Sequence, residues 1–225
     1  MAFKARNLPD QVAQYLSEKI LSGEIQPGER VLEKNLADEL GISRGPIREA
    51  FRILERSMLL DLAPRHGATV TEVSPSFAAW LHDILAQLLK LSVREAARLR
   101  TDEHVTRLQH VLQRIEETAQ RDDPIAGFEG ILQFLGVCQQ AAMNPLLRRL
   151  LQDLEPGIRR TLSSLHLHEN GDLWVGMGLL ERTAQCIQQK KGEMAEDTIE
   201  TYLTEIKALV IERITKGRPS QQASL

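Results

Sequence analysis

The sequence predicts a mainly α-helical protein in two parts, a small N-terminal domain with some β-structure and an all-helical domain after it. Apolar residues recur at helical spacing along most of the 225 residues. Two short apolar runs, MLLDLA and GATVTEV, flank a Pro-Arg-His-Gly sequence and indicate a β-hairpin. Strand-like runs vanish after a Ser-Pro-Ser linker. We therefore divide the chain into residues 1–73, a linker at 74–76, a helical domain at 77–216 and a polar tail at 217–225.

The first two predicted helices have the features of a packed helix pair. The first ends near Gly23 and carries an apolar residue every four positions, at Leu8, Val12, Leu16 and Ile20. The sequence IQPGER indicates a turn, and KNLADELGIS indicates a short second helix. Ala37 lets two helices cross closely and Gly41 permits a sharp turn, which a helix-turn-helix requires. Its shared core is expected to comprise Leu36, Leu40, Ile42 and Ile47.

The third predicted helix, SRGPIREAFRILER at 43–56, has two chemically different faces. One face carries an arginine every four residues, at Arg44, Arg48, Arg52 and Arg56. The opposite face is apolar and comprises Ile47, Ala50, Phe51 and Leu54. Ser43 is a suitable N-cap, and Pro46 falls in the first turn. Exposed arginines on a helix are usually only solvated, but the preceding turn and the following hairpin favour binding to DNA.

The predicted hairpin is interpreted as the wing of a winged helix. Arg65 and His66 stand at its tip, and Gly67 supplies a backbone conformation that other residues resist. A wing tip of this kind can enter a minor groove beside the major groove that a recognition helix occupies.

Composition and charge narrow the classes of function. The formal net charge is −3, and residues 1–73 hold ten Lys and Arg against eleven Asp and Glu, so DNA binding must depend on where the arginines lie. Cys138 and Cys186, the two cysteines, lack metal-finger or redox spacing and indicate reduced thiols. No segment resembles a signal peptide or a membrane span, and we expect a cytoplasmic protein without a membrane partner.

The run LSGEIQPGERVLEKNLADELGISRGPIREAFRILERSMLLDLAPRHGATVTEV, at 21–73, resembles the N-terminal domain of GntR-type transcription regulators. The resemblance implies DNA contacts by Lys34, Ser43, Arg44, Gly45, Arg48, His66 and Gly67. Gly45 stands where the family usually has Thr, and Met58 where a Gly commonly closes the recognition helix. We assign phosphate contacts to Lys34 and Arg52, base edges to Arg44 and Arg48, and the minor groove to the wing-tip residue His66.

The helical domain resembles the FadR-type effector domain called FCD. We expect helices at 76–99, 102–121, 124–142, 145–165, 172–190 and 194–215. The resemblance rests on their order and lengths, on the WLHDIL sequence that opens the domain, on FLGVCQQAAMNP and on a Lys-Lys-Gly-Glu turn before the last helix.

Many FCD domains bind a divalent metal through an Asp and three His. Alignment on Asn144 and Pro145 places these ligands on Ile131, Leu135, Arg182 and Tyr202, which are unsuited to the task, so we expect no metal or other cofactor. The carboxylate-binding Arg of the family falls on Leu85. A small-molecule effector would then use polar groups that are more often merely solvated: His82, Gln133, Gln139, Arg159 and Arg160.

We therefore predict a DNA-binding transcription regulator, a repressor, that binds a short palindromic operator as a homodimer and responds to a small metabolite. Two alternatives are weighed. The helical domain serves only for dimerisation, or it is a metal-dependent enzyme in which Asp122, Asp123 and Glu129 contribute carboxylates. Asp-Asp-Pro is also an ordinary helix start and no nucleophile has a base nearby, so we do not expect an enzyme.

Overall fold

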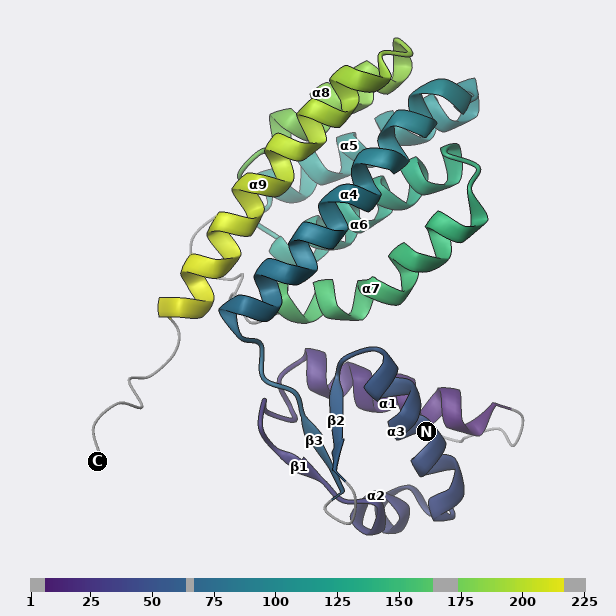
Figure 1. Ribbon diagram of the computed structural model, residues 1–225, viewed down its shortest axis with the longest axis vertical. Coiled ribbons are helices and arrows are strands. Elements are labelled where there is room, and N and C mark those ends of the chain that lie inside the picture. The colour runs from purple at the N-terminus through teal and green to yellow at the C-terminus, as the bar shows by residue number, and fades with distance from the viewer. Residues whose placement is uncertain (1–6, 64–66, 164–173, 217–225) are drawn as a thin grey trace. The chain divides into compact units, whose positions relative to one another are not determined.

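The computed structural model describes residues 7–63, 67–163 and 174–216 (Figure 1). Its internal contacts divide the chain into two units. The first comprises the described residues up to Ser74 together with Asp153–Ser163, and the second comprises the other described residues. Residues 153–163 were expected in the helical domain, because a helical pattern does not reveal which neighbours a helix end will have.

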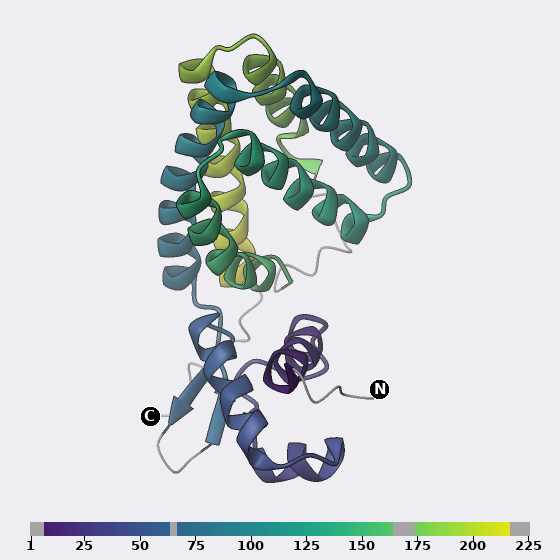
Figure 2. The same ribbon diagram turned by 90° about the vertical axis from the view of Figure 1, so that its right-hand side faces the viewer.

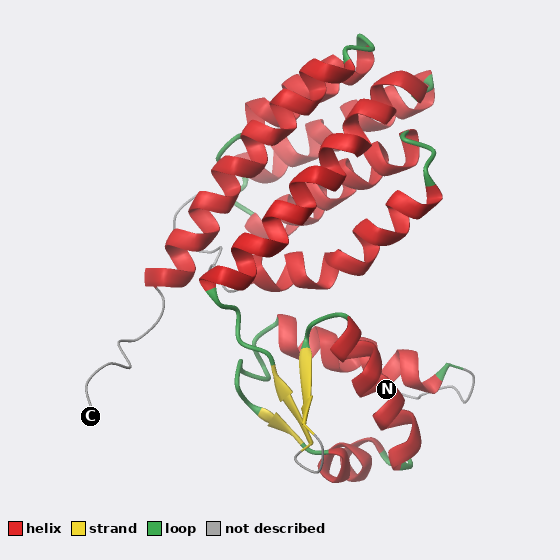
Figure 3. Cartoon of the chain, in the orientation of Figure 1, coloured by secondary structure: helices red, strands yellow, loops and turns green. Residues whose placement is uncertain are grey.

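The first unit combines three helices with a small sheet (Figure 3). Its elements are α1 (Leu8–Leu21), β1 (Arg30–Val31), α2 (Glu33–Leu40), α3 (Arg44–Arg56), β2 (Leu60–Ala63) and β3 (Gly67–Val70). The sheet is antiparallel with the order β1-β3-β2. The predicted hairpin is thus β2 and β3. Strand β1 was not predicted, because a strand of two residues inside a turn-rich segment leaves no alternating pattern.

The core of the first unit is built from the predicted apolar faces. Leu16 of α1 is 1% exposed, and Ile47 of α3 is fully buried. Apolar residues of the sheet complete the cluster, and Leu40 and Ile42 pack against it while partly exposed. Burying each such side chain contributes about 1.5–3 kcal/mol relative to leaving it in water, so the core determines how α3 is held.

Polar contacts tie α1 to α2. The Tyr15 hydroxyl donates to Glu39 Oε1 at 2.7 Å, and Lys19 Nζ lies 2.7 Å from Glu24 and 3.4 Å from Glu39. The hydrogen bond to Glu24 is the largest cause that raises the pKa of Lys19 above its ordinary value. These groups border water, so apolar packing dominates the stability of this helix pair.

The second unit is helical (Figure 2), and the last part of one of its helices, Asp153–Ser163, is assigned to the first unit by its contacts. The helices are α4 (Pro75–Leu99), α5 (Asp102–Gln120), α6 (Pro124–Ala141), α7 (Pro145–Ser163), α8 (Met177–Gln188) and α9 (Gly192–Lys216). The predicted start of α8 at residue 172 is wrong. The helix begins after Gly176, whose φ of 78° is not helical, and the predicted residues 164, 165, 172 and 173 lie outside the described part.

Helices α4 and α9 pack along each other. Apolar residues such as Leu89 and Val210, both fully buried, lie on their inner faces. Lys90 lies 2.7 Å from Glu200, and Lys207 forms an ion pair with Asp83. The pattern is that of an amphipathic helix pair whose apolar stripes meet and whose ion pairs line the margin.

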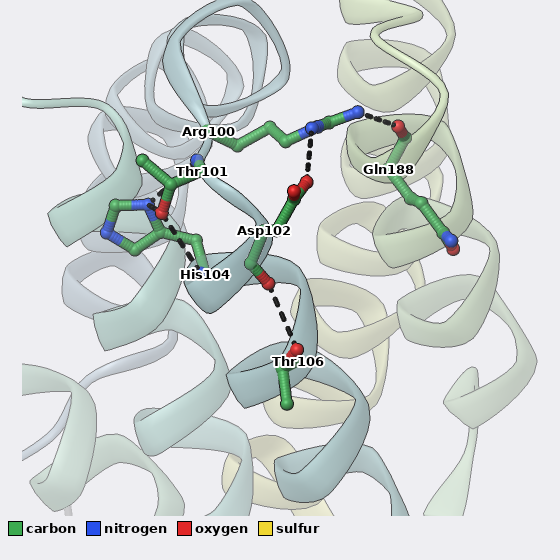
Figure 4. A network of polar contacts seen from close by, with 6 residues as sticks. All are labelled: Arg100, Thr101, Asp102, His104, Thr106 and Gln188. Atoms are coloured by element: carbon green, nitrogen blue, oxygen red, sulfur yellow. Dashed lines mark hydrogen bonds and ion pairs between the residues drawn. The ribbon is translucent and has the colours of Figure 1, made fainter.

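A polar network holds the corner between α4 and α5 (Figure 4). Arg100 donates from Nη2 to the carbonyl of Gln188 at 2.6 Å and from Nη1 to Asp102 at 3.3 Å. Thr101 is the N-cap of α5 and forms a capping box with His104, whose Nδ1 accepts the Thr101 backbone N–H at 3.1 Å. The corner therefore satisfies donors that the first turn of a helix leaves open.

Within the described ranges, no helix combines the length and the apolar character that crossing a membrane would require.

Candidate nucleic-acid interface

The arginine face of α3 is exposed along its full length. Arg44, Arg48, Arg52 and Arg56 are all exposed, as the sequence spacing predicts. On the other face Ile47, Ala50, Phe51 and Leu54 are 0%, 0%, 3% and 2% exposed. The helix is thus anchored by its apolar face, and its guanidinium groups point to solvent.

The turn before α3 has the geometry of a helix-turn-helix. Helix α2 ends at Gly41, which has a φ of 66°, and the amide of Ile42 donates to the carbonyl of Ala37 at 3.2 Å. A side chain at position 41 would have open space around it, so glycine is favoured there by backbone conformation rather than by crowding.

Arg48 is oriented by an acidic partner on α2. Its Nε donates to both carboxylate oxygens of Glu33, at 3.0 Å and 2.8 Å, while its side chain stays 62% exposed. Because a guanidinium has five N–H donors, this contact leaves the outer nitrogens to face a ligand. The ion pair contributes little to stability in water but restricts the direction of the side chain.

The start of α3 is open toward solvent. Ser43 occupies the N-cap, as predicted, although its side chain accepts no capping hydrogen bond. A Cβ on Gly45 would meet nothing within 4 Å, and Lys34 at the start of α2 is exposed. The start of α3, the helix end that approaches base edges in helix-turn-helix complexes, is therefore accessible from solvent.

The wing consists of β2 and β3, with Thr69 at the centre of the sheet opposite Asp61. The predicted tip residues Arg65 and His66 lie outside the described residues. Gly67 has a φ of 82°, and a Cβ there would lie 3.3 Å from the carbonyl oxygen of Val31. Gly67, predicted to contact DNA, therefore also has a structural reason to be glycine.

The turn that ends α3 has a methionine in a conformation suited to glycine. Met58 has a φ of 57°. Its amide donates to the carbonyl of Glu55, and the amide of Leu59 donates to that of Leu54, both at 2.9 Å. This is the Schellman pattern, and a non-glycine residue in it costs about 1 kcal/mol or more.

Hydrogen bonds that sequence reasoning missed stabilise this turn within the first unit. Thr71 Oγ1 donates to the Met58 carbonyl at 2.7 Å. Arg160, 3% exposed and in the part of α7 that belongs to this unit, donates from Nη1 to the carbonyls of Met58 and Leu59 at 3.3 and 3.2 Å and contacts Thr71 Oγ1. Burial lowers the pKa of Arg160 to about 10, so it remains charged at neutral pH.

The other predicted effector-binding residues are dispersed. Arg159 donates to Glu155 at 2.9 Å, Gln133 is exposed and Gln139 is half-buried. His82 is 3% exposed, and neither ring nitrogen has a hydrogen-bond partner in the described structure. Burial, followed by the charge of Lys207, lowers the pKa of His82 to about 4.

The four positions aligned with family metal ligands differ in burial. Ile131, Leu135 and Tyr202 are 5%, 7% and 4% exposed, whereas Arg182 is exposed. Among the residues whose placement is described, no three His, Cys, Asp or Glu side chains are grouped to hold a metal ion.

A helix-turn-helix followed by a hairpin, with arginines along its second helix, defines the winged-helix class of DNA-binding domains. Two models of known protein families match the chain. The model for "Bacterial regulatory proteins, gntR family" matches residues 8–70, and that for "FCD domain" matches residues 81–205. The chain therefore belongs to the FCD-domain family, and its residues 8–70 match the gntR family of bacterial regulatory proteins; its relatives are transcriptional regulators and not enzymes.

Two curated relatives agree with this assignment. HTH-type transcriptional regulator YdhC of Bacillus subtilis (strain 168) is 34% identical over 102 residues, 45% of this chain and 46% of that protein. HTH-type transcriptional regulator McbR of Escherichia coli (strain K12) is 31% identical over 113 residues, 50% of this chain and 51% of that protein. The matched region spans about half the length of these curated relatives.

Solved structures share the fold. E. coli McbR/YncC matches with a TM-score of 0.77 and 23% identity, covering 92% of this chain and 98% of that one. A GntR structure from Rhodococcus sp. RHA1 matches with a TM-score of 0.70 and 19% identity, covering 94% and 99% of the two chains. At these identities the likeness concerns the fold alone.

Proposed function

We propose that this protein is a transcription repressor that binds a short palindromic operator as a homodimer and that a small metabolite in the helical domain changes its affinity for DNA. The observation that carries the proposal is the α3 helix, which exposes Arg44, Arg48, Arg52 and Arg56 while its opposite face is buried. The assignment of a repressor draws on a relative, the "Gluconate operon transcriptional repressor" of Bacillus licheniformis, 31% identical over 113 residues.

The roles of the basic side chains follow from their positions. Arg44 and Arg48 lie in the first half of α3, the part that approaches base edges in this class of complex, and their forked donors match the acceptors of guanine. Lys34 at the start of α2 and Arg52 further along α3 are assigned to phosphates, which position the protein without reading sequence.

A homodimer is proposed because one recognition helix reads only a few base pairs. Two copies related by a two-fold axis would read two half-sites about one helical turn apart, which raises discrimination over other DNA. Binding of a metabolite would affect repression only through unequal affinity for the DNA-bound and free arrangements.

The test is an alanine substitution in the first half of α3. Operator fragments are selected from genomic DNA with the wild-type chain, and affinity is then measured by fluorescence anisotropy at fixed salt. We expect Arg48→Ala to weaken specific binding by roughly 1–3 kcal/mol, or about 5- to 150-fold, with little change for unrelated DNA.

Arg56→Ala is the matched control, because it removes the same charge from the exposed end of α3 that lies away from the helix start. It should lower affinity for all sequences slightly and equally. Thermal unfolding checks that both variants fold. Wild-type operator affinity in Arg48→Ala, or an equal specific loss in both variants, would refute the base-contact assignment.

A ligand-independent repressor is the second candidate. It is favoured by the apolar residues Ile131 and Leu135, both buried where the family resemblance places metal ligands. Operator affinity measured with and without a panel of metabolites separates the two. A change with one metabolite supports modulation, and identical affinities throughout support a helical domain that only dimerises.

A further inference from the structure

A surface groove of about 420 Å³ lies between α5 and α6, entirely within the second unit. The antiparallel helices bring two pairs of residues opposite each other, Arg107 with Gln140 and Arg114 with Gln133. The polar or glycine residues that line it are Arg107, His110, Arg114, Gln133, Gly136 and Gln140. Its volume falls in the range of small-molecule sites, about 300–1,000 Å³.

The groove holds two arginines without an acidic partner. Arg107 Nη1 donates to Gln140 Oε1 at 2.7 Å, and Arg114 Nη1 donates to Gln133 Oε1 at 3.3 Å. Neither arginine forms an ion pair with any residue that the structure describes, and no carboxylate lines the groove. The neutral glutamines orient the guanidinium groups without forming an ion pair with them, in contrast to Arg94 and Lys90 of α4, which are paired with carboxylates.

The two charges lie at opposite ends of the groove. Arg107 and Arg114 are seven residues apart on α5, so their backbones are separated by about 10 Å at a rise of about 1.5 Å per residue. Val111 and Val137 provide an apolar stretch between them. His110 adds a ring nitrogen midway along the same helix.

Gly136 keeps the middle of the groove open. A Cβ at Gly136 would meet nothing within 4 Å, whereas a Cβ at Gly130 of the same helix would lie 2.6 Å from Ile115. Close packing of α5 and α6 therefore accounts for Gly130 but not for Gly136. A mid-helix glycine costs about 1 kcal/mol relative to alanine, so Gly136 lowers helix stability without a packing benefit.

We propose that the α5–α6 groove is a binding site for an elongated dianion, with one carboxylate or phosphate on each of Arg107 and Arg114 and an apolar middle over Gly136. Carboxylates and phosphates are the groups that forked guanidinium donors bind best. The apolar stretch between the charges favours a chain-like ligand over a compact ion. The site does not depend on the proposed DNA binding and is tested without DNA.

The probes are suberate and hexane-1,6-diyl bis(methyl phosphate), two linear dianions that differ in end group, measured by isothermal titration calorimetry on the full chain. Octanoate is the matched monoanion and inorganic phosphate the compact anion. We expect at least one linear dianion to bind about tenfold more tightly than octanoate and phosphate. A preference between the two dianions identifies the end group.

Variants locate the site. Arg107→Gln and Arg114→Gln should each weaken binding of the dianion about tenfold, and Gly136→Leu should abolish it. Arg121→Gln makes the same charge change at an exposed residue just after α5, and Gly178→Leu fills open space on α8, so both should bind as the wild type does. Circular dichroism checks that every variant is folded.

Three results would overturn the proposal. The first is no binding of either dianion at 10 mM, about the highest concentration at which millimolar affinity is measurable. The others are an affinity for octanoate equal to that for the dianions, and equal losses of dianion affinity in Arg121→Gln and Arg107→Gln. A normal operator affinity in Arg107→Gln keeps the groove separate from the DNA-binding proposal, whose failure would appear only in the α3 variants.

Discussion

Two glycines four residues apart, Gly41 in the turn before α3 and Gly45 in the first turn of α3, should respond in opposite directions to the same substitution. Neither Gly41 nor Gly45 would place a Cβ within 4 Å of another residue, so crowding plays no part. Gly41 has a φ of 66°, whereas Gly45 lies in the first turn of α3. We expect Gly41→Ala to destabilise the first unit and Gly45→Ala to stabilise it.

The magnitudes follow from the backbone. An alanine in the left-handed region costs roughly 1–2 kcal/mol, offset by about 0.4–1 kcal/mol from the less flexible unfolded chain. Gly41→Ala should thus lower the free energy of unfolding by about 1 kcal/mol. In Gly45→Ala no such strain arises, and a gain of about 0.5 kcal/mol is expected for the end of a helix.

The assay must report on the first unit. Both tryptophans, Trp80 and Trp174, lie outside residues 1–74, so their fluorescence does not follow it. Hydrogen–deuterium exchange of peptides covering α1 and α3 measures the opening free energy directly. Equal shifts of the same sign in both variants would show that the conformation of residue 41 does not govern this turn.

Two further predictions concern the helical unit. Because the pKa of His82 falls from about 6.5 to about 4 on folding, its neutral form is favoured in the native state, and stability should decline as pH falls from about 6.5 toward 4. Between pH 7.5 and 5, the free energy of unfolding of His82→Leu, measured in urea, should fall by roughly 2 kcal/mol less than that of the wild type. The same pH dependence in both proteins would contradict this. Gly130→Ala, whose Cβ would lie 2.6 Å from Ile115, should destabilise by about 1–3 kcal/mol, whereas Gly136→Ala should stabilise slightly; equal effects in thermal unfolding would count against the packing difference.

Much of the fold was predictable because helices leave a repeating pattern. The exposed face of α3 is the predicted arginine face that begins at Arg44, and its buried face is the predicted apolar face that begins at Ile47. Helices α5 and α6 begin directly after the N-caps Thr101 and Asp123. The start of α8 was predicted at the Asn-Gly-Asp sequence, and only the structure shows that the helix begins after Gly176, whose φ of 78° is not helical.

The site was predictable only in part. The positions of basic residues on α3 came from the sequence, but the partner of Arg48 did not, since Glu33 lies on another helix. The roles of the predicted effector residues and the absence of a cofactor remain predictions, and so do the wing-tip contacts of Arg65 and His66.

By itself, the sequence determined which side of each helix is apolar, because residues three and four apart share a face whatever the helix packs against. Only the tertiary structure decided that Arg160 donates to the turn at Met58 and that Gly136 faces open space while Gly130 faces Ile115. Such pairings join residues far apart in the chain, and no local pattern records them.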